Sequence, residues 1–183
     1  MLRAQINPHF LFNTLNNIDT LIHTSPDTAS KMLINLSELL RYMIYETQTD
    51  KVSYSKETEY IKGFVELQKL RFKAGAISLN IENQVPDTFI APMLFIPFVE
   101  NAFKYAHNKG NYPIISIEIK NENNAVYFSC RNSYNPEETK QNKSGGVGLE
   151  NVKRRLELLY PQKHKLIISK ENCIFDVQLI LSL

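Results

Sequence analysis

Apolar residues recur every three or four positions through the first 75 residues of the chain, a spacing typical of amphipathic helices. One stripe covers residues 11–22 and another residues 32–43, and a third helix is expected over residues 55–74, with no strand in this part. Ser25 is a candidate N-cap for the second helix, followed by a proline at the first helical position. Gly75 is the expected stop of the third helix. The positions predicted to face inward are Leu11, Leu15, Ile18, Ile22, Met32, Leu36, Leu39, Met43, Ile61, Phe64 and Leu67.

In the rest of the chain the apolar pattern becomes alternating, which is typical of half-buried strands. Two helices, over about residues 93–107 and 148–160, interrupt these strands. Because strands and helices do not alternate regularly, the pattern favours an α+β protein with a two-layer α/β sandwich over a doubly wound sheet. We therefore predict a helical region over residues 1–75 and a sandwich domain over residues 76–183, with a polar loop at 133–146. The predicted strands are 77–81, 113–120, 125–132, 165–169 and 173–181.

Composition mainly excludes classes of protein and of partner. The chain has 183 residues, 43% of them hydrophobic and 22% charged, as expected of a globular protein. A net charge of +2 gives no support for nucleic acid as the main partner. Cys130 and Cys173 lie far apart in apolar runs, so we expect reduced thiols. The longest apolar run, residues 90–99, is too short to cross a bilayer, and we expect an intracellular piece whose upstream part is missing.

The stretch "QINPHFLFNTLNNI" carries a histidine on its polar side. On a helical wheel His9 points away from Leu11 and shares a face with Gln5, Asn13 and Asn16. A single histidine is most often an ordinary surface or core residue. An imidazole with its reference pKa is mostly neutral at pH 7, however, and then has a nucleophilic ring nitrogen. The pattern supports a reactive His9 without deciding between these alternatives.

A second candidate site lies in "PMLFIPFVENAFKYAH", where Glu100, Lys104 and His107 share one helical face beside Asn101. An exposed ion pair between Glu100 and Lys104 without function is one interpretation. The other is a phosphate site with a carboxylate, a cation for phosphate oxygens and an amide oxygen that can ligate Mg²⁺. The residues alone leave both open.

The third candidate site is "SGGVGLENVKRRLELLY", in which Gly145, Gly146 and Gly148 lead directly into a helix. Glycines permit close approach of the backbone, and the N–H groups at a helix start favour phosphate. The stretch is not a P-loop, because no GKS or GKT follows. A flexible linker is the alternative interpretation.

Taken together, "LRAQINPHFLFNTLNNI", "LSELLRYMIYE", "PFVENAFKYAH" and "GGVGLENVKRRLELLYP" resemble the sensor histidine kinases of the LytS type over nearly the whole chain. The resemblance implies a helical dimerisation and phosphoacceptor region followed by a Bergerat-type ATP-binding domain. It implies that His9 accepts the phosphoryl group, that Asn101 holds Mg²⁺, and that Gly146 and Gly148 border the ATP phosphates beneath a lid. It also implies a homodimer through the N-terminal helices and a response regulator as partner. The further ATP-binding residues that it implies are Lys104, Tyr105, His107, Asn132, Gly145 and Leu149.

The chain departs from this family at three places. The stretch "SCRNSYNP" has Arg131 and Asn132 where an adenine-binding aspartate is usual, so Asn132 would accept a weaker hydrogen bond. Tyr105 and the alanine after it replace a compact His-Gly pair. Phe10 follows His9 where many histidine kinases have an acidic residue. Asn13 is then the candidate to orient the imidazole and Glu100 the candidate base.

The favoured hypothesis is the cytoplasmic catalytic part of a two-component kinase, which uses ATP and Mg²⁺. The resemblance implies a full-length protein attached to the inner or plasma membrane through the missing sensor. One alternative is a dimeric signalling scaffold without productive ATP binding. It is suggested by the missing adenine-binding carboxylate. Another is an ATP-driven conformational machine, against which the small size and the HFLFN stretch argue.

Overall fold

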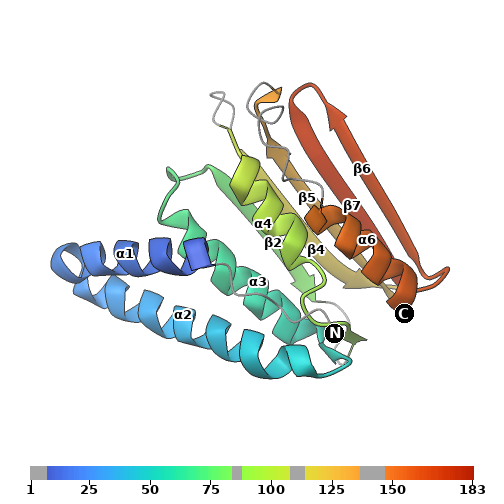
Figure 1. Cartoon of the computed structure of the whole chain (residues 1–183), viewed down its shortest axis with the longest axis horizontal. Coiled ribbons are helices and arrows are strands. Elements are labelled where there is room, and N and C mark those ends of the chain that lie inside the picture. Colours follow the sequence, from blue (N-terminus) through green and yellow to red (C-terminus); the bar gives the residue numbers. More distant parts are fainter. Residues whose placement is uncertain (1–7, 84–87, 108–113, 137–146) are drawn as a thin grey trace.

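A computed structural model describes residues 8–83, 88–107, 114–136 and 147–183. It has a helical part packed beside a mixed sheet (Figure 1). The elements are α1 (Pro8–Thr24), α2 (Pro26–Tyr45), η1 (Glu46–Gln48), β1 (Val52–Ser53), α3 (Tyr54–Lys69), β2 (Ile77–Asn83), β3 (Phe89–Ile90), α4 (Ile96–Tyr105), β4 (Ile115–Glu122), β5 (Ala125–Ser133), α6 (Val147–Leu159), β6 (His164–Glu171) and β7 (Ile174–Ser182).

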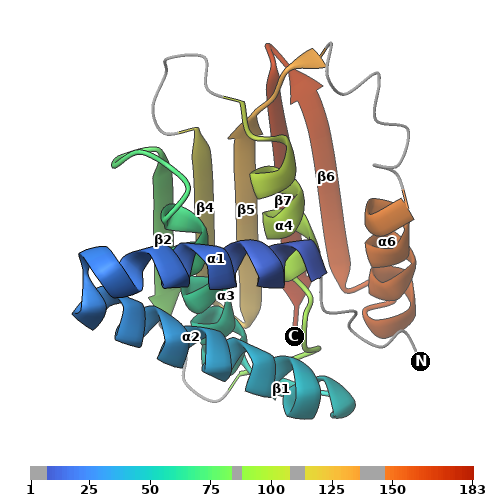
Figure 2. The same ribbon diagram turned by 60° about the vertical axis from the view of Figure 1, so that its left-hand side comes forward.

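The main sheet has the strand order β2-β4-β5-β7-β6. β2 runs parallel to β4, and the other neighbours are antiparallel. Helices α3, α4 and α6 cover one face of the sheet (Figures 1 and 2). The predicted α+β class is thereby confirmed, and all five predicted strands are present. The short pair β1 and β3 was not predicted, and the expectation of no strand before residue 75 is wrong at Val52–Ser53.

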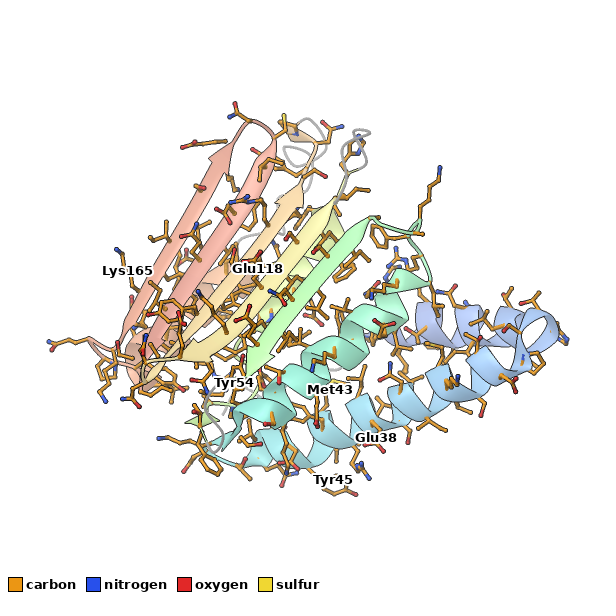
Figure 3. The ribbon with its side chains drawn as sticks, turned by 180° about the vertical axis from the view of Figure 1, so that it is seen from behind. Glu38, Met43, Tyr45, Tyr54, Glu118 and Lys165 are labelled. Atoms are coloured by element: carbon orange, nitrogen blue, oxygen red, sulfur yellow. The ribbon has the colours of Figure 1, made fainter. Side chains whose placement is uncertain are left out.

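The two faces of the sheet differ in character because side chains alternate along each strand. On β4 and β5 the residues facing the helices are buried, among them Ile117, Phe128 and Cys130. The opposite face carries polar residues such as Glu118 and Lys165 (Figure 3). Both cysteines are free thiols, as predicted. Within the described part of the chain, no helix is long and apolar enough to span a membrane.

The helical stripes are mostly as predicted. Leu36 and Leu39 of α2 are buried, and so are Ile61, Phe64 and Leu67 of α3. In α1 the prediction is only partly right, because Ile18 is buried whereas Leu15 and Ile22 are exposed in the single chain. Thr14 and Ile18 face the other helices instead, and Phe10 packs on Phe64. Leu11, Met32 and Met43 are half-buried and pack against the core.

The predicted helix ends are confirmed at the start of α2 but not at the end of α3. Ser25 is at the N-cap of α2, but its hydroxyl bonds to the Thr28 hydroxyl and caps no backbone N–H. α3 ends at Lys69, because the N–H groups of Arg71 and Phe72 bond to carbonyls three residues back and tighten the last turn. Gly75 therefore lies beyond the helix, at φ 81, in the turn to β2.

Helix α4 begins at Ile96 and not near residue 93. Met93 has a φ of 55, in the left-handed region that an α-helix cannot contain. The predicted helix at 148–160 is α6, shifted by one residue.

Candidate active site

His9 lies exposed in the first turn of α1, where Pro8 begins the helix. Its neighbour Phe10 fixes this turn to the rest of the chain, because its ring stacks on Phe64 of α3 with centroids 4.9 Å apart. Phe64 in turn meets Phe103 of α4 edge to face at 5.8 Å. This aromatic series brings the start of α1 next to α4 (Figure 2).

Asn13 contacts the imidazole from the next turn of α1. Its amide nitrogen Nδ2 lies 3.2 Å from each ring nitrogen of His9. Asn13 thus has the geometry to orient the imidazole, at the same distance from both ring nitrogens.

Helix α4 presents its polar residues on one side because its other side is buried. Phe98, Val99 and Ala102 pack into the core, which leaves Glu100 and Lys104 on the opposite face. Among the described residues no ion pair joins Glu100 to Lys104. The Lys104 ammonium lies 5.1 Å from the centroid of the Tyr105 ring, so a simple surface ion pair does not account for this face.

A cavity of about 580 Å³ lies between α1, α3, α4 and the start of α6. It brings His9 together with Glu100, Asn101 and Lys104, which lie about 90 residues later in the sequence. The full set of lining residues is His9, Phe10, Phe64, Gln68, Arg71, Pro97, Glu100, Asn101, Phe103, Lys104, Tyr105 and Gly148. All three sequence motifs thus contribute to one cavity.

Desolvation dominates the electrostatics of Glu100. Burial raises the pKa of this carboxyl above its ordinary value. Burial, followed by the charges of Glu100 and Glu57, raises the pKa of Tyr60 on α3 as well. Glu100 lines the same cavity as the exposed imidazole of His9, and a carboxylate with a raised pKa is suited to accept a proton.

The remaining predicted site residues, apart from Gly148 at the cavity wall, lie outside the cavity or outside the described residues. Gly145 and Gly146 fall outside the described residues. A Cβ atom at Gly148 would meet no atom of the other described residues within 4 Å, so among these residues the space beside it is open. Leu149 packs against the core. His107 is at the end of the α4 segment, where its carbonyl accepts the Ser133 hydroxyl, and it does not line the cavity.

Asn132 lies on β5 and is 1% exposed. Its Nδ2 donates to the Ser133 carbonyl, whereas its buried Oδ1 has no hydrogen-bond partner among the described residues. An unpaired buried acceptor is costly, and an adenine amino group could satisfy it. Asn132 does not line the cavity described above.

The residues present fit Mg²⁺ held mainly by phosphates. The described residues include no cluster of three or more His, Cys, Asp or Glu side chains that could hold a metal. Asn101 contributes an amide oxygen at the cavity wall. Mg²⁺ commonly takes one or two protein ligands together with phosphate oxygens and water, so this sparse set is adequate.

Two polar lining residues, Gln68 and Arg71, were missed by the sequence analysis. Gln68 is in the last turn of α3 and Arg71 lies just beyond this helix, where its guanidinium donates to the Gln68 side chain at 3.3 Å. The signal was present in "ELQKLRF", where an amide and a guanidinium interrupt an amphipathic helix. Nothing in that pattern indicated that they would face α4, because this depends on how α3 packs.

Comparison with known proteins agrees with this geometry. A protein-family model described as histidine kinase matches residues 1–76. The sensor histidine kinase YpdA of Escherichia coli (strain K12) is 33% identical over 172 residues, which are 87% of this chain and 30% of that protein. The sensor protein LytS of Oceanobacillus iheyensis is 30% identical over 198 residues, or 98% of this chain and 33% of that protein. The chain therefore spans about a third of the length of these relatives.

Among solved structures, the catalytic domain of histidine kinase ThkA superposes with a TM-score of 0.52. The match is 18% identical and covers 73% of this chain and 97% of that one. At this identity it bears on the fold alone. The sequence matches place the chain among the relatives of sensor histidine kinases. Within that class, the chain belongs to the LytS-type family.

Proposed function

We propose that this chain is the catalytic part of a two-component kinase that phosphorylates His9 from ATP and passes the phosphoryl group to an aspartate of a response regulator. The observation that carries the proposal is the shared cavity, lined by His9, Glu100, Asn101 and Lys104. Phosphoryl transfer needs an aligned nucleophile and charge stabilisation, and these side chains can supply both. The kinase names of the relatives support the same class of reaction.

In the proposed step, the unprotonated ring nitrogen of His9 attacks the γ-phosphorus of ATP. The bond from that phosphorus to the bridging oxygen breaks, and ADP leaves with the electron pair. Asn13 orients the imidazole, and Glu100 accepts the remaining ring proton, a role that suits its raised pKa. Lys104 and the N–H groups at the start of α6 stabilise charge on the phosphate oxygens.

Nucleotide and metal are assigned to residues of the sandwich. Asn101 would hold Mg²⁺, which supplies charge neutralisation on the β- and γ-phosphates. The Oδ1 atom of Asn132, buried without a partner among the described residues, is the proposed acceptor for the adenine amino group. The backbone around Gly148 would lie beside the phosphates, since no other described residue fills the space next to it.

We further propose that the chain forms a homodimer through α1 and α2. Both helices carry large apolar side chains that are exposed in the single chain: Phe12, Leu15, Ile22, Leu33, Ile34, Ile44 and Tyr45. A contiguous apolar surface of this kind marks an interface. Packing of two such helix pairs would bury it in a four-helix bundle.

The test is incubation of the chain with γ-labelled ATP and Mg²⁺ beside the His9→Gln variant. Acid-labile, base-stable label on the wild-type chain, and none on His9→Gln, is the expected result. His23→Gln serves as a matched control, because His23 lies on the same helix but does not line the cavity. Label that persists in His9→Gln would show that the acceptor is another residue.

The non-enzymatic scaffold rests on one observation, the absence of a carboxylate at Asn132. Calorimetric titration with Mg–ATP distinguishes the two functions. The kinase requires binding, and binding should weaken in Asn101→Asp. No binding at millimolar nucleotide, together with an intact dimer, would favour the scaffold.

A further inference from the structure

The segment that leads into α4 is held by a buried carboxylate of α3. Glu57 is 0% exposed. It accepts hydrogen bonds from the backbone N–H groups of Met93 at 2.9 Å, Leu94 at 2.8 Å and Phe95 at 3.4 Å. These groups lie at the positive end of the α4 dipole, where a negative charge is stabilising. None of the chemistry proposed above uses this carboxylate.

The same segment is also held from the side of α6. Arg155 donates to the carbonyl oxygens of Pro92 at 2.6 Å and Met93 at 3.1 Å. The hydroxyl of Tyr160, directly after α6, accepts the Ala91 N–H at 2.8 Å. The start of α4 is therefore tied to the helix whose first turn contains Gly148 and lines the cavity.

Tyr42 extends this network to α2. Its hydroxyl donates to Glu57 at 2.5 Å, and its ring stacks on Tyr60 with centroids 4.7 Å apart. Burial and the Glu57 charge raise the pKa of Tyr42, which keeps the hydroxyl protonated as a donor. Only Ser25 separates α2 from α1. A displacement of α2 therefore also moves the helix that carries His9.

The backbone at the start of α4 needs such support. Met93 has a φ of 55, an unfavourable conformation for a residue with a side chain. Both its N–H and its carbonyl are used, the first by Glu57 and the second by Arg155. The direction in which α4 leaves this turn sets where Glu100 and Asn101 point.

We propose that Glu57 is a positioning residue that orients α4 at the nucleotide site and, through Tyr42, links this orientation to α2. The proposal rests on the proposed kinase function. In this proposal, the Tyr42–Glu57 contact aligns His9 with the phosphates. The contacts of Glu57 with the backbone place Asn101. A shift of α2 in the whole protein would then change the rate of phosphorylation through this contact.

The test compares Tyr42→Phe and Glu57→Gln with the wild-type chain, by Mg–ATP calorimetry and by the initial rate of His9 labelling. Tyr42→Phe removes the donor to Glu57 but keeps the ring that stacks on Tyr60. Tyr127→Phe is the control, because Tyr127 lies on β5, on the sheet face opposite the helices, and lines neither the cavity nor the proposed dimer surface. Thermal unfolding of each variant shows whether it is folded at the assay temperature.

We expect Tyr42→Phe to retain its Mg–ATP affinity and to label about tenfold more slowly, since misalignment alone can cost this much or more. Glu57→Gln places an amide donor against backbone donors, so both affinity and rate should fall. A purely structural role would lower the unfolding temperature without separating rate from affinity. A wild-type labelling rate in Tyr42→Phe would overturn the proposal. If the wild-type chain takes no label, the kinase function fails, and an unchanged Mg–ATP affinity in Glu57→Gln would then overturn the positioning role.

Discussion

Phe10 explains at the residue scale why this site can lack an acidic residue next to its histidine. The position serves packing, since the Phe10 ring stacks on Phe64 and fixes the first turn of α1. The proposed base, Glu100, lies instead on α4 and lines the same cavity as His9. A base supplied by the nucleotide domain would act only when His9 faces that domain, which ties proton acceptance to the docked arrangement.

Arg71 is expected to contribute to the rate. It lines the cavity on the α3 side, whereas Lys104 lines it on the α4 side, so the two cations can contact different phosphate oxygens. Arg71→Ala should lower the labelling rate by about a hundredfold, as expected when a transition-state donor is lost. Lys73→Ala, a nearby cation that does not line the cavity, should label normally. Equal rates for the two variants would contradict a role for Arg71.

Glu100 is expected to destabilise the fold while serving the reaction. Burial raises the pKa of Glu100 in the folded state above 4.5, the ordinary value that applies in the unfolded state. At a pH between the unfolded-state and folded-state pKa, the folded chain therefore holds a proton that the unfolded chain has released. Stability therefore falls as pH rises through this window, and the full penalty remains above it. Glu100→Gln should raise the free energy of unfolding at pH 8, with a smaller gain at pH 5, in urea titrations. The same variant should label more slowly. No gain in stability at pH 8 would contradict the effect of burial.

At the scale of elements, the sequence predicted those whose signal is local. The five long strands follow from alternation, and Leu36, Leu39 and Phe64 were correctly placed from helical spacing. The start of α4 was not predictable in this way. It depends on Glu57, which lies 36 residues before Met93 and looks in the sequence like one more surface charge of a helix.

The exposed faces of α1 and α2 carry a prediction about assembly. Leu33→Glu places a charge in the middle of the apolar surface of α2 and should convert a dimer into a monomer, as measured by light scattering. Leu158→Glu is the control, because Leu158 is 73% exposed but lies on α6, outside the proposed interface. A Leu33→Glu chain that remains dimeric would place the interface elsewhere.

At the scale of the whole molecule, the site forms because segments distant in the sequence pack against one another, and no single segment predicts this packing. The motifs around His9, Asn101 and Gly148 were recognisable separately. Their convergence on one cavity depends on how Phe10 and Phe64 dock α1 beside α4. The same packing places Gln68 and Arg71 at the cavity. The sequence could therefore predict the class of site but not all the residues that line it.

The central claim is that the acceptor and the nucleotide residues of one chain form a single site, because His9 and Asn101 of the same chain line one cavity. Mixed dimers of His9→Gln with Asn101→Asp test this most directly. One chain then has a nucleotide site without an acceptor, and the other an acceptor without a nucleotide site. Phosphorylation within a chain predicts no label in the mixed dimer, with normal label when wild-type chains are mixed under the same conditions. Label on the Asn101→Asp chain would contradict the account, because the phosphoryl group would then have come from the other chain.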